Sequence, residues 1–248
     1  MVAAKILRSV GSIEDRQRFL RETTALKRLS HPTLIRHIDS GFDDGWGQFV
    51  VTEWVEGRDL EEFLRADGRP SLEVGLDIAR QLASGMAHVH ARGMLHRDLK
   101  PANVRVSEPP VRVKILDFGL ARQFGAGAET AVTGHGQFLG TPRYVSPEQA
   151  RGELHIDPRA DVFSLGGVFY RCFSGKPAFD APTLRELLHN ICSEPHQPLA
   201  SLVELPTRLG DLVDSMLEKD SSRRPPHAQA VLDVLDELSV SGRPHGPT

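Results

Sequence analysis

Residues 96–103 form an octet, His-Arg-Asp-Leu-Lys-Pro-Ala-Asn, whose side chains suit phosphate chemistry. Asp98 can accept the proton of an attacking hydroxyl group, and Lys100 can neutralise charge on a phosphoryl group in transfer. Asn103, with Asp117 after a short hairpin, offers the oxygen ligands that Mg²⁺ prefers. Each residue alone could be an ordinary turn or surface residue, because an Asp in a turn is usually a cap. Together they agree in type and order, which favours a phosphoryl-transfer site.

The octet resembles the catalytic loop of a protein kinase, and Asp117-Phe118-Gly119 resembles the metal-binding turn that follows it in that family. The resemblance implies ATP and Mg²⁺ as cofactors. It implies catalytic roles for Asp98, Lys100, Asn103 and Asp117. The metal ligands would be Asn103 and Asp117. Structural roles are implied for His96, Arg97 and Phe118.

The start of the chain, residues 2–7, is predicted to be a buried strand in which Lys5 is the one charge. A lysine on a strand usually lies at a solvated edge. Here Val-Ala-Ala-Lys resembles the kinase strand whose lysine holds the nucleotide phosphates, with Ala3 beside the nucleotide. Residues 12–29 predict a helix that begins at a capping-box-like Ser12. The resemblance pairs Glu22 of this helix with Lys5.

Two further strands are predicted over residues 34–40 and 48–53, joined by a turn rich in Asp and Gly. Residues 52–57, Thr-Glu-Trp-Val-Glu-Gly, resemble the hinge between the two kinase lobes. On its own this segment is equally consistent with an ordinary strand followed by a turn.

The hinge resemblance implies contacts to ATP. The Glu53 carbonyl and the Val55 amide would bond the adenine edge, Thr52 would guard the back of the pocket, and Asp59 would contact the ribose. The expected ATP-binding residues are therefore Ala3, Lys5, Glu22, Thr52, Glu53, Val55, Asp59, Lys100, Asn103 and Asp117.

The remainder of the chain is predicted to be mainly helical. Residues 71–91 have a helical apolar pattern that leads to His96, and residues 161–173 are apolar on every side, as in a buried helix. Three further helices are predicted near 183–192, 209–217 and 227–238. Short strands at 104–106 and 111–116 form a hairpin that puts Asp117 beside Asn103. We expect an α+β, bilobal, protein-kinase-like fold with a truncated, small, β-rich N-lobe and a large helical C-lobe. The expected divisions are a partial N-lobe at 1–55, a C-lobe at 56–238 and a flexible tail at 239–248.

Residues 117–148 have few helix or strand signals, and a loop of this length is usually functional or disordered. Its last part, residues 140–148, resembles the kinase segment that ends in Ala-Pro-Glu, with Ser146 in place of Ala. The resemblance implies an activation loop with Thr130, Thr133 and Thr141. We expect phosphorylation, preferably at Thr133, to order this loop by pairing with Arg97.

Two structural roles follow from the same resemblance. Glu148 would form a buried ion pair with Arg224, with Arg223 as the alternative partner. Asp161 would fasten the backbone of the catalytic loop.

The substrate class is indicated by Lys100, two residues after Asp98, and by Thr141 in Gly-Thr-Pro. Both resemble serine/threonine rather than tyrosine kinases, and residues 146–152 resemble the Hanks-type, eukaryotic-like kinases of bacteria. The implied partners are proteins that carry Ser or Thr, together with a second copy of the chain for autophosphorylation. Small-molecule phosphotransferases share the Asp and Asn spacing but generally lack Arg97 and the closing Pro-Glu.

The composition indicates which partners and which cellular compartment to expect. The 248 residues are 40% apolar and 25% charged, and a net charge of −3 gives no reason to expect a nucleic-acid partner. Cys172 and Cys192 form neither a disulfide framework nor a metal-ligand spacing. No signal peptide opens the chain, and the apolar stretch 162–173 is too short to span a membrane. We therefore expect a cytoplasmic protein with no membrane segment.

Two departures from the family pattern leave two functions open. No Gly-rich loop precedes Lys5, and position 105, where the family usually has an apolar side chain under adenine, carries Arg105. The chain is thus either a fragment of an active kinase or a pseudokinase-like binding or scaffold module with weak or no catalysis. The complete set of catalytic residue types favours the kinase. For the 248-residue chain alone we expect weak binding of Mg²⁺-ATP, because phosphate donors are lost.

Overall fold

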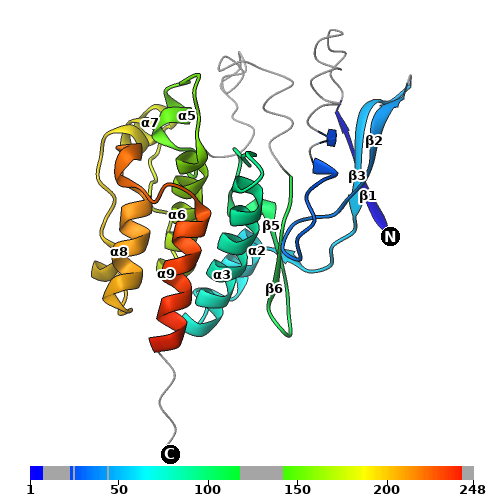
Figure 1. Ribbon diagram of the computed structural model, residues 1–248. Coiled ribbons are helices and arrows are strands. Elements are labelled where there is room, and N and C mark those ends of the chain that lie inside the picture. Colours follow the sequence, from blue (N-terminus) through cyan, green and yellow to red (C-terminus); the bar gives the residue numbers. More distant parts are fainter. Residues whose placement is uncertain (8–22, 25, 44, 118–141, 242–248) are drawn as a thin grey trace, which may run out of the picture.

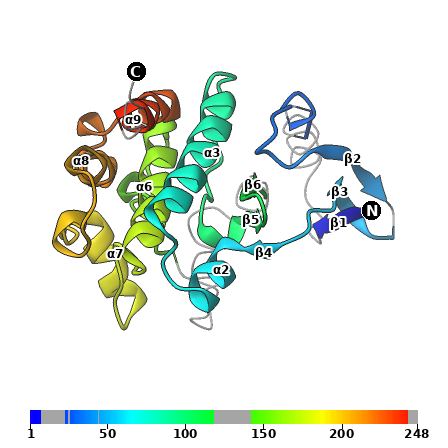
Figure 2. The ribbon, with the colours of Figure 1, turned by 90° about the horizontal axis from the view of Figure 1, so that it is seen from below.

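The computed structural model describes residues 1–7, 23–24, 26–43, 45–117 and 142–241. A small β-sheet lobe and a larger, mainly helical lobe lie side by side, and the chain crosses between them after β3 (Figures 1 and 2). The expected α+β, bilobal arrangement is confirmed.

The described residues of the small lobe form an antiparallel sheet with the strand order β1-β3-β2. Its strands are β1 (Val2–Leu7), β2 (His37–Asp43) and β3 (Gly47–Glu53). Lys5 is opposite Val50 in this register, and Ala3 is opposite Thr52. The predicted strand at 34–40 begins later than expected, because Leu34 is buried and bridges to Ile115 of the large lobe.

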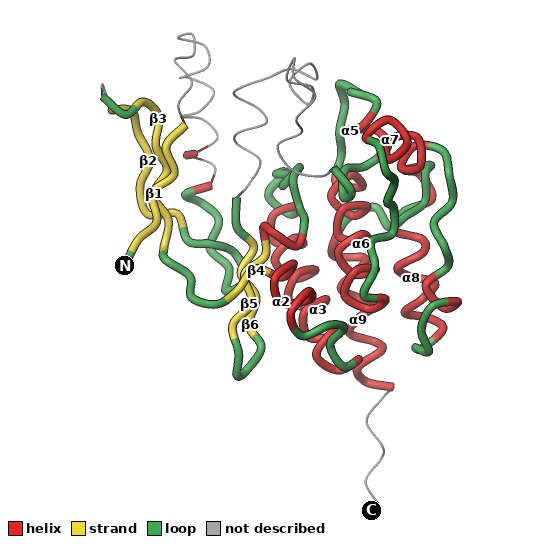
Figure 3. The backbone as a smooth tube through the Cα atoms, turned by 180° about the vertical axis from the view of Figure 1, so that it is seen from behind, coloured by secondary structure: helices red, strands yellow, loops and turns green. Residues whose placement is uncertain are grey.

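A second small sheet, with the order β4-β5-β6, lies between the first sheet and the helices (Figure 3). Its strands are β4 (Arg58–Asp59), β5 (Val104–Ser107) and β6 (Arg112–Ile115). The predicted hairpin is confirmed. Along β5 the burial alternates, with Val104 and Val106 in the core and Arg105 and Ser107 on the other face.

Several helices of the large lobe begin or end at recognisable caps. Ser71 accepts a hydrogen bond from the Val74 N–H at the start of α3, and Gly175, with φ of 74°, ends α6 in a left-handed conformation. The predicted helix at 161–173 begins earlier, because Asp157 caps it and Pro158 is its first residue. The described helices are α2 (Leu60–Ala66), α3 (Leu72–His90), α5 (Pro147–Ala150), α6 (Pro158–Ser174), α7 (Leu184–Cys192), α8 (Thr207–Met216) and α9 (Ala228–Ser241).

Helix α6 is the centre of the large lobe, as its apolar sequence predicts. Phe163 and Phe169 are almost fully buried, and the helix packs against α3, α8 and α9. At Gly166 a Cβ atom would lie 2.7 Å from the Cβ of Met216, so only glycine permits this approach of α6 to α8. Within the described residues, none of the helices has both the length and the apolar character needed to cross a membrane.

Candidate active site

Two side chains of the catalytic-loop octet, those of Lys100 and Asn103, meet at the carboxylate of Asp98. Lys100 Nζ donates to Asp98 Oδ2 at 2.8 Å, and Asn103 Nδ2 donates to the same oxygen at 3.0 Å. Asn103 Nδ2 also lies 2.7 Å from the Asp98 backbone oxygen. A 3₁₀ turn at Pro101–Asn103 makes this closure possible, since it brings Asn103 back over Asp98. These contacts fix the orientation of the Asp98 carboxylate before any substrate binds.

Asp161 on α6 holds the loop from behind. Its Oδ2 accepts the His96 backbone N–H at 2.8 Å, and its Oδ1 accepts the Arg97 backbone N–H at 2.8 Å. His90 Nε2 lies 3.1 Å from Oδ2. Burial raises the pKa of Asp161, but the hydrogen bond and charge of His90 and the backbone donor of His96 outweigh burial and lower it overall. The carboxylate therefore stays ionised where it anchors the loop.

His96 connects the catalytic loop to the strand that leads to Asp117. Its side chain is completely buried, and burial lowers its pKa, so the ring is neutral. Nε2 donates to the Leu116 carbonyl at 2.8 Å, and Nδ1 accepts the Asp98 backbone N–H at 3.3 Å. The Leu116 N–H in turn donates to the Asn103 carbonyl at 2.8 Å. The two predicted metal ligands are thereby brought next to each other.

Lys5 crosses from the small lobe to Asp117. The distance between Lys5 Nζ and Asp117 Oδ2 is 3.0 Å, and both side chains are 51% exposed. Asp117 has a φ of 39°, an uncommon backbone conformation that directs its side chain toward the small lobe. The expected partner of Lys5, Glu22, lies outside the described residues. The inter-lobe pair with Asp117 was not expected from the sequence.

The donor set at this point suits Mg²⁺. Asn103 uses its amide nitrogen toward Asp98, which leaves an amide oxygen as a metal ligand, and Asp117 is a carboxylate. Mg²⁺ is commonly held by one or two such oxygens together with substrate phosphates. No cluster of three or more His, Cys, Asp or Glu side chains suited to a metal occurs in the described part of the chain. A phosphate-assisted site does not need one.

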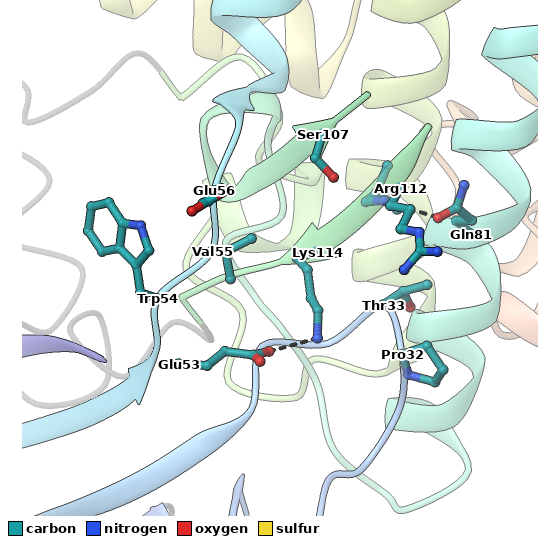
Figure 4. A pocket seen from close by; sticks show the side chains of 11 residues that line it. Pro32, Thr33, Glu53, Trp54, Val55, Glu56, Gln81, Ser107, Arg112 and Lys114 are labelled. Atoms are coloured by element: carbon teal, nitrogen blue, oxygen red, sulfur yellow. Dashed lines mark hydrogen bonds and ion pairs between the residues drawn. The ribbon is translucent and has the colours of Figure 1, made fainter. Parts of the chain in front are cut away.

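The hinge segment directs the Glu53 side chain toward Lys114 of β6 (Figure 4). Glu53 Oε1 lies 2.7 Å from Lys114 Nζ and accepts the Arg36 backbone N–H at 3.0 Å. Burial raises the pKa of Glu53, but Lys114 and Arg36 lower it further than burial raises it. Thr52 lies beside Ala3 in the sheet, and Val55 follows where the chain leaves the sheet. Contacts to Lys114 and Arg36 thus hold the Glu53 side chain of this segment in place.

Behind the hinge is a cavity of about 610 Å³ (Figure 4). It is lined by the hinge residues 53–56, the loop at 32–33, Gln81 of α3, and the outer face of the β5–β6 hairpin. None of the predicted catalytic residues lines it. This cavity is therefore separate from the catalytic loop.

Asp59, the expected ribose contact, is the N-cap of α2. Its Oδ1 accepts the Glu62 N–H at 2.7 Å, and the Glu62 side chain reaches back to the Asp59 N–H. This is a capping box, and the Asp-x-x-Glu spacing is the signal that would have predicted it.

Glu148 and Arg224 form a bidentate, buried ion pair. Arg224 donates to both Glu148 oxygens at 2.7 and 3.0 Å, and its side chain is 0% exposed. Further donors of Arg224 reach the Glu218, Arg159 and Lys219 carbonyls. The alternative, Arg223, pairs with Glu218 at the surface instead.

Gln149 is a positioning residue that sequence reasoning missed. Its Nε2 donates to the Arg97 carbonyl at 2.9 Å, while its Oε1 accepts the Ser146 N–H in a capping box. The Ser-x-x-Gln spacing was the available signal. Arg97, whose φ is 64°, is therefore held at its N–H by Asp161 and at its C=O by Gln149. Other predicted site residues lie outside the described part of the chain: Phe118, Thr130, Thr133 and Thr141.

Comparison with known proteins places this geometry in context. A family model described as the protein kinase domain matches residues 1–234. The serine/threonine-protein kinase pkn2 of Myxococcus xanthus is 39% identical, over 88% of this chain and 27% of its own length. PknA of Mycobacterium tuberculosis is 33% identical, over 100% of this chain and 57% of its own length.

Among solved structures, Rad53 residues 1–466 in complex with AMP-PNP has a TM-score of 0.74 and 29% identity. The match covers 94% of this chain and 57% of that one. This chain therefore spans between 27% and 57% of the length of the relatives named here.

Proposed function

This chain belongs to the protein kinase family, with the Hanks-type serine/threonine kinases of bacteria among its relatives, and we propose that it transfers the γ-phosphate of ATP to Ser or Thr of protein substrates. The observation that carries the proposal is the closed cluster of Asp98, Lys100 and Asn103. A binding module has no need for this arrangement.

The geometry supports the following roles. Asp98 accepts the proton of the substrate hydroxyl, and its fixed orientation means that little reorganisation is needed during the reaction. Lys100, whose ammonium group is already at Asp98, neutralises charge on the transferred group. Asn103 and Asp117 would hold Mg²⁺, which neutralises phosphate charge when bound. Lys5 is close enough to Asp117 to share the nucleotide phosphates with the metal site.

The remaining elements of the proposal concern binding and setting. The hinge backbone at Glu53 and Val55 would bind the adenine edge. The protein substrate, and a second copy of the chain for autophosphorylation, would be phosphorylated in the cytoplasm, where two unpaired cysteines remain reduced.

The test is a phosphotransfer assay with the 248-residue chain, Mg²⁺-ATP and a library of Ser/Thr peptides. We expect phosphoserine or phosphothreonine from the parent and a loss of about 10²–10⁴-fold in the turnover rate with Asp98→Asn. The matched control is Asp67→Asn, a surface carboxylate in the same lobe, which should keep the parent rate. Equal rates for the Asp98→Asn variant and the parent would overturn the proposal.

A further inference from the structure

The cavity behind the hinge, about 610 Å³ in volume, has walls that are fixed by hydrogen bonds (Figure 4). The Ile115 N–H donates to the Thr33 carbonyl at 2.7 Å, which ties the β5–β6 hairpin to the loop at 32–33. The Gln81 side chain donates to the Val111 carbonyl at 3.1 Å and accepts the Val113 N–H at 3.0 Å, which ties the hairpin to α3. A volume of this size is typical of a site for a small molecule, and fixed walls lower the cost of binding one.

Two cations of β6 line this cavity. Arg112 and Lys114 lie on the same face of the strand, while Val113 between them is 2% exposed and belongs to the core. Lys114 Nζ lies 2.7 Å from Glu53 Oε1 and donates to the Leu34 carbonyl at 3.1 Å. The Arg112 guanidinium, by contrast, has no hydrogen bond or ion pair with any residue in the described part of the chain. Arg112 therefore brings an uncompensated positive charge to the cavity.

The two carboxylates that line the cavity do not neutralise Arg112. Glu53 already accepts from Lys114 and, at 3.0 Å, from the Arg36 backbone N–H. Glu56 is exposed, and its side chain points away from Arg112 (Figure 4). The Arg112 end of the cavity therefore attracts an anion.

The other lining groups indicate the chemistry of a matching ligand. Ser107 is directly opposite Arg112 in the hairpin register, and its side chain also lines the cavity (Figure 4). A guanidinium beside a hydroxyl suits a carboxylate or phosphate group, because arginine donates two parallel hydrogen bonds to either. Pro32 and Val55 add apolar surface, which suits a carbon skeleton attached to that group.

We propose that this cavity is an effector site for a small organic anion, whose carboxylate or phosphate group binds at Arg112 and Ser107. The site shares no residue with the catalytic loop, but it shares Glu53 and Val55 with the hinge. An anion beside Lys114 competes with Glu53 for that ammonium group. A further consequence rests on the proposed function, which places adenine at the backbone of the same hinge residues. Occupancy of the cavity should weaken ATP binding, and ATP should weaken binding of the anion by the same factor.

The test titrates the 248-residue chain with three aromatic probes, benzoate, phenyl phosphate and the neutral benzamide, and follows their binding by NMR. We expect both anions to bind, and benzamide to bind at least about tenfold more weakly, because it lacks the charge-assisted hydrogen bonds. Arg112→Met should weaken both anions by about ten- to a hundredfold and leave benzamide unchanged. Comparison of the two anions shows whether the site prefers a carboxylate or a phosphate.

A second measurement needs no mutation. Phenylglyoxal modifies accessible arginines, and mass spectrometry then gives the extent of modification at each one. Both anions should protect Arg112 from this reagent, and benzamide should not.

Two substitutions are matched controls for the loss of a positive charge. Arg65→Met removes an exposed arginine of α2 that does not line the cavity, so binding of the anions should stay at the parent level. Lys5→Met removes the cation at the proposed nucleotide site, and it too should leave binding of the anions unchanged.

Three outcomes would overturn the effector site: a parent chain that binds neither anion, an equal loss of binding in Arg65→Met, or a loss in Lys5→Met in place of Arg112→Met. An ATP affinity that is the same with and without saturating benzoate or phenyl phosphate would overturn the coupling alone. A chain that binds the anions at Arg112 but phosphorylates no protein would overturn the proposed function and leave the site in place.

Discussion

On the large-lobe side of the active site, Asp161 holds the catalytic loop from a position that is 1% exposed, whereas on the small-lobe side Lys5 meets Asp117 with both side chains 51% exposed. A buried carboxylate that accepts several hydrogen bonds cannot exchange them for water without a large cost. A half-exposed ion pair exchanges its partner for water at little cost. The chain therefore holds the proposed proton-accepting end of its site firmly and leaves the proposed nucleotide and metal end adjustable.

The largest effect is expected from Asp161→Ala, which removes the buried carboxylate that holds the catalytic loop. The substitution leaves His90 and two backbone N–H groups without their buried partner, so we expect about 3–5 kcal/mol of destabilisation. The phosphotransfer rate should fall by about 10²-fold or more even where the protein is folded, because Asp98 loses its position. Chemical denaturation and rate measurements below the unfolding midpoint separate the two effects. Asp157→Ala, an exposed cap on the same helix, is the control and should cost only about 1 kcal/mol.

A change of pH tests, without a mutation, how the stability of the fold depends on its buried histidines. Burial lowers the folded-state pKa of His31, His88 and His96 below the ordinary 6.5. The unfolded chain then binds more protons than the folded chain as the pH falls below about 6.5, so stability decreases in that range. We expect a lower melting temperature at about pH 5.5 than at about pH 7.5. His88→Gln should reduce this difference, and equal melting temperatures at the two pH values would contradict the prediction.

The smallest effect on stability is expected for Lys5→Met. The loss of a half-exposed pair should change the free energy of unfolding by less than about 1 kcal/mol, and by less still at high salt. ATP binding, by contrast, should weaken, because the phosphates lose a cation. A destabilisation as large as that of Asp161→Ala would remove the distinction between the two sides of the site.

The catalytic loop could be predicted from sequence because its contacts are local. Lys100 and Asn103 lie within five residues of Asp98, so the order of residue types already specifies which groups meet. The Glu148–Arg224 pair joins residues 76 positions apart, and only the family resemblance singled out those two among the many charged residues. The separation of two residues along the chain, rather than the strength of their interaction, limited what could be predicted from the sequence.

Other contacts were missed because they depend on how parts of the fold come together. The pairing of Lys5 with Asp117 needs the two lobes to be placed relative to each other, which no local pattern encodes. The tether from Gln149 to Arg97 depends on the loop adopting an uncommon backbone conformation. Asp59 is a different case, since its capping role is local and could have been predicted from the Asp-x-x-Glu spacing, while its expected ribose contact stays a prediction.

The backbone at Arg97 also bears on how this chain would respond to stabilising design. A left-handed φ of 64° costs a residue with a side chain roughly 1 kcal/mol that glycine would not pay, and Asp161 and Gln149 hold the peptide in that state. A search for stabilising substitutions would therefore choose glycine here. Glycine would, however, remove the guanidinium that we expect to pair with a phosphorylated activation loop. At position 97, a substitution that stabilises the fold is therefore expected to lower the activity.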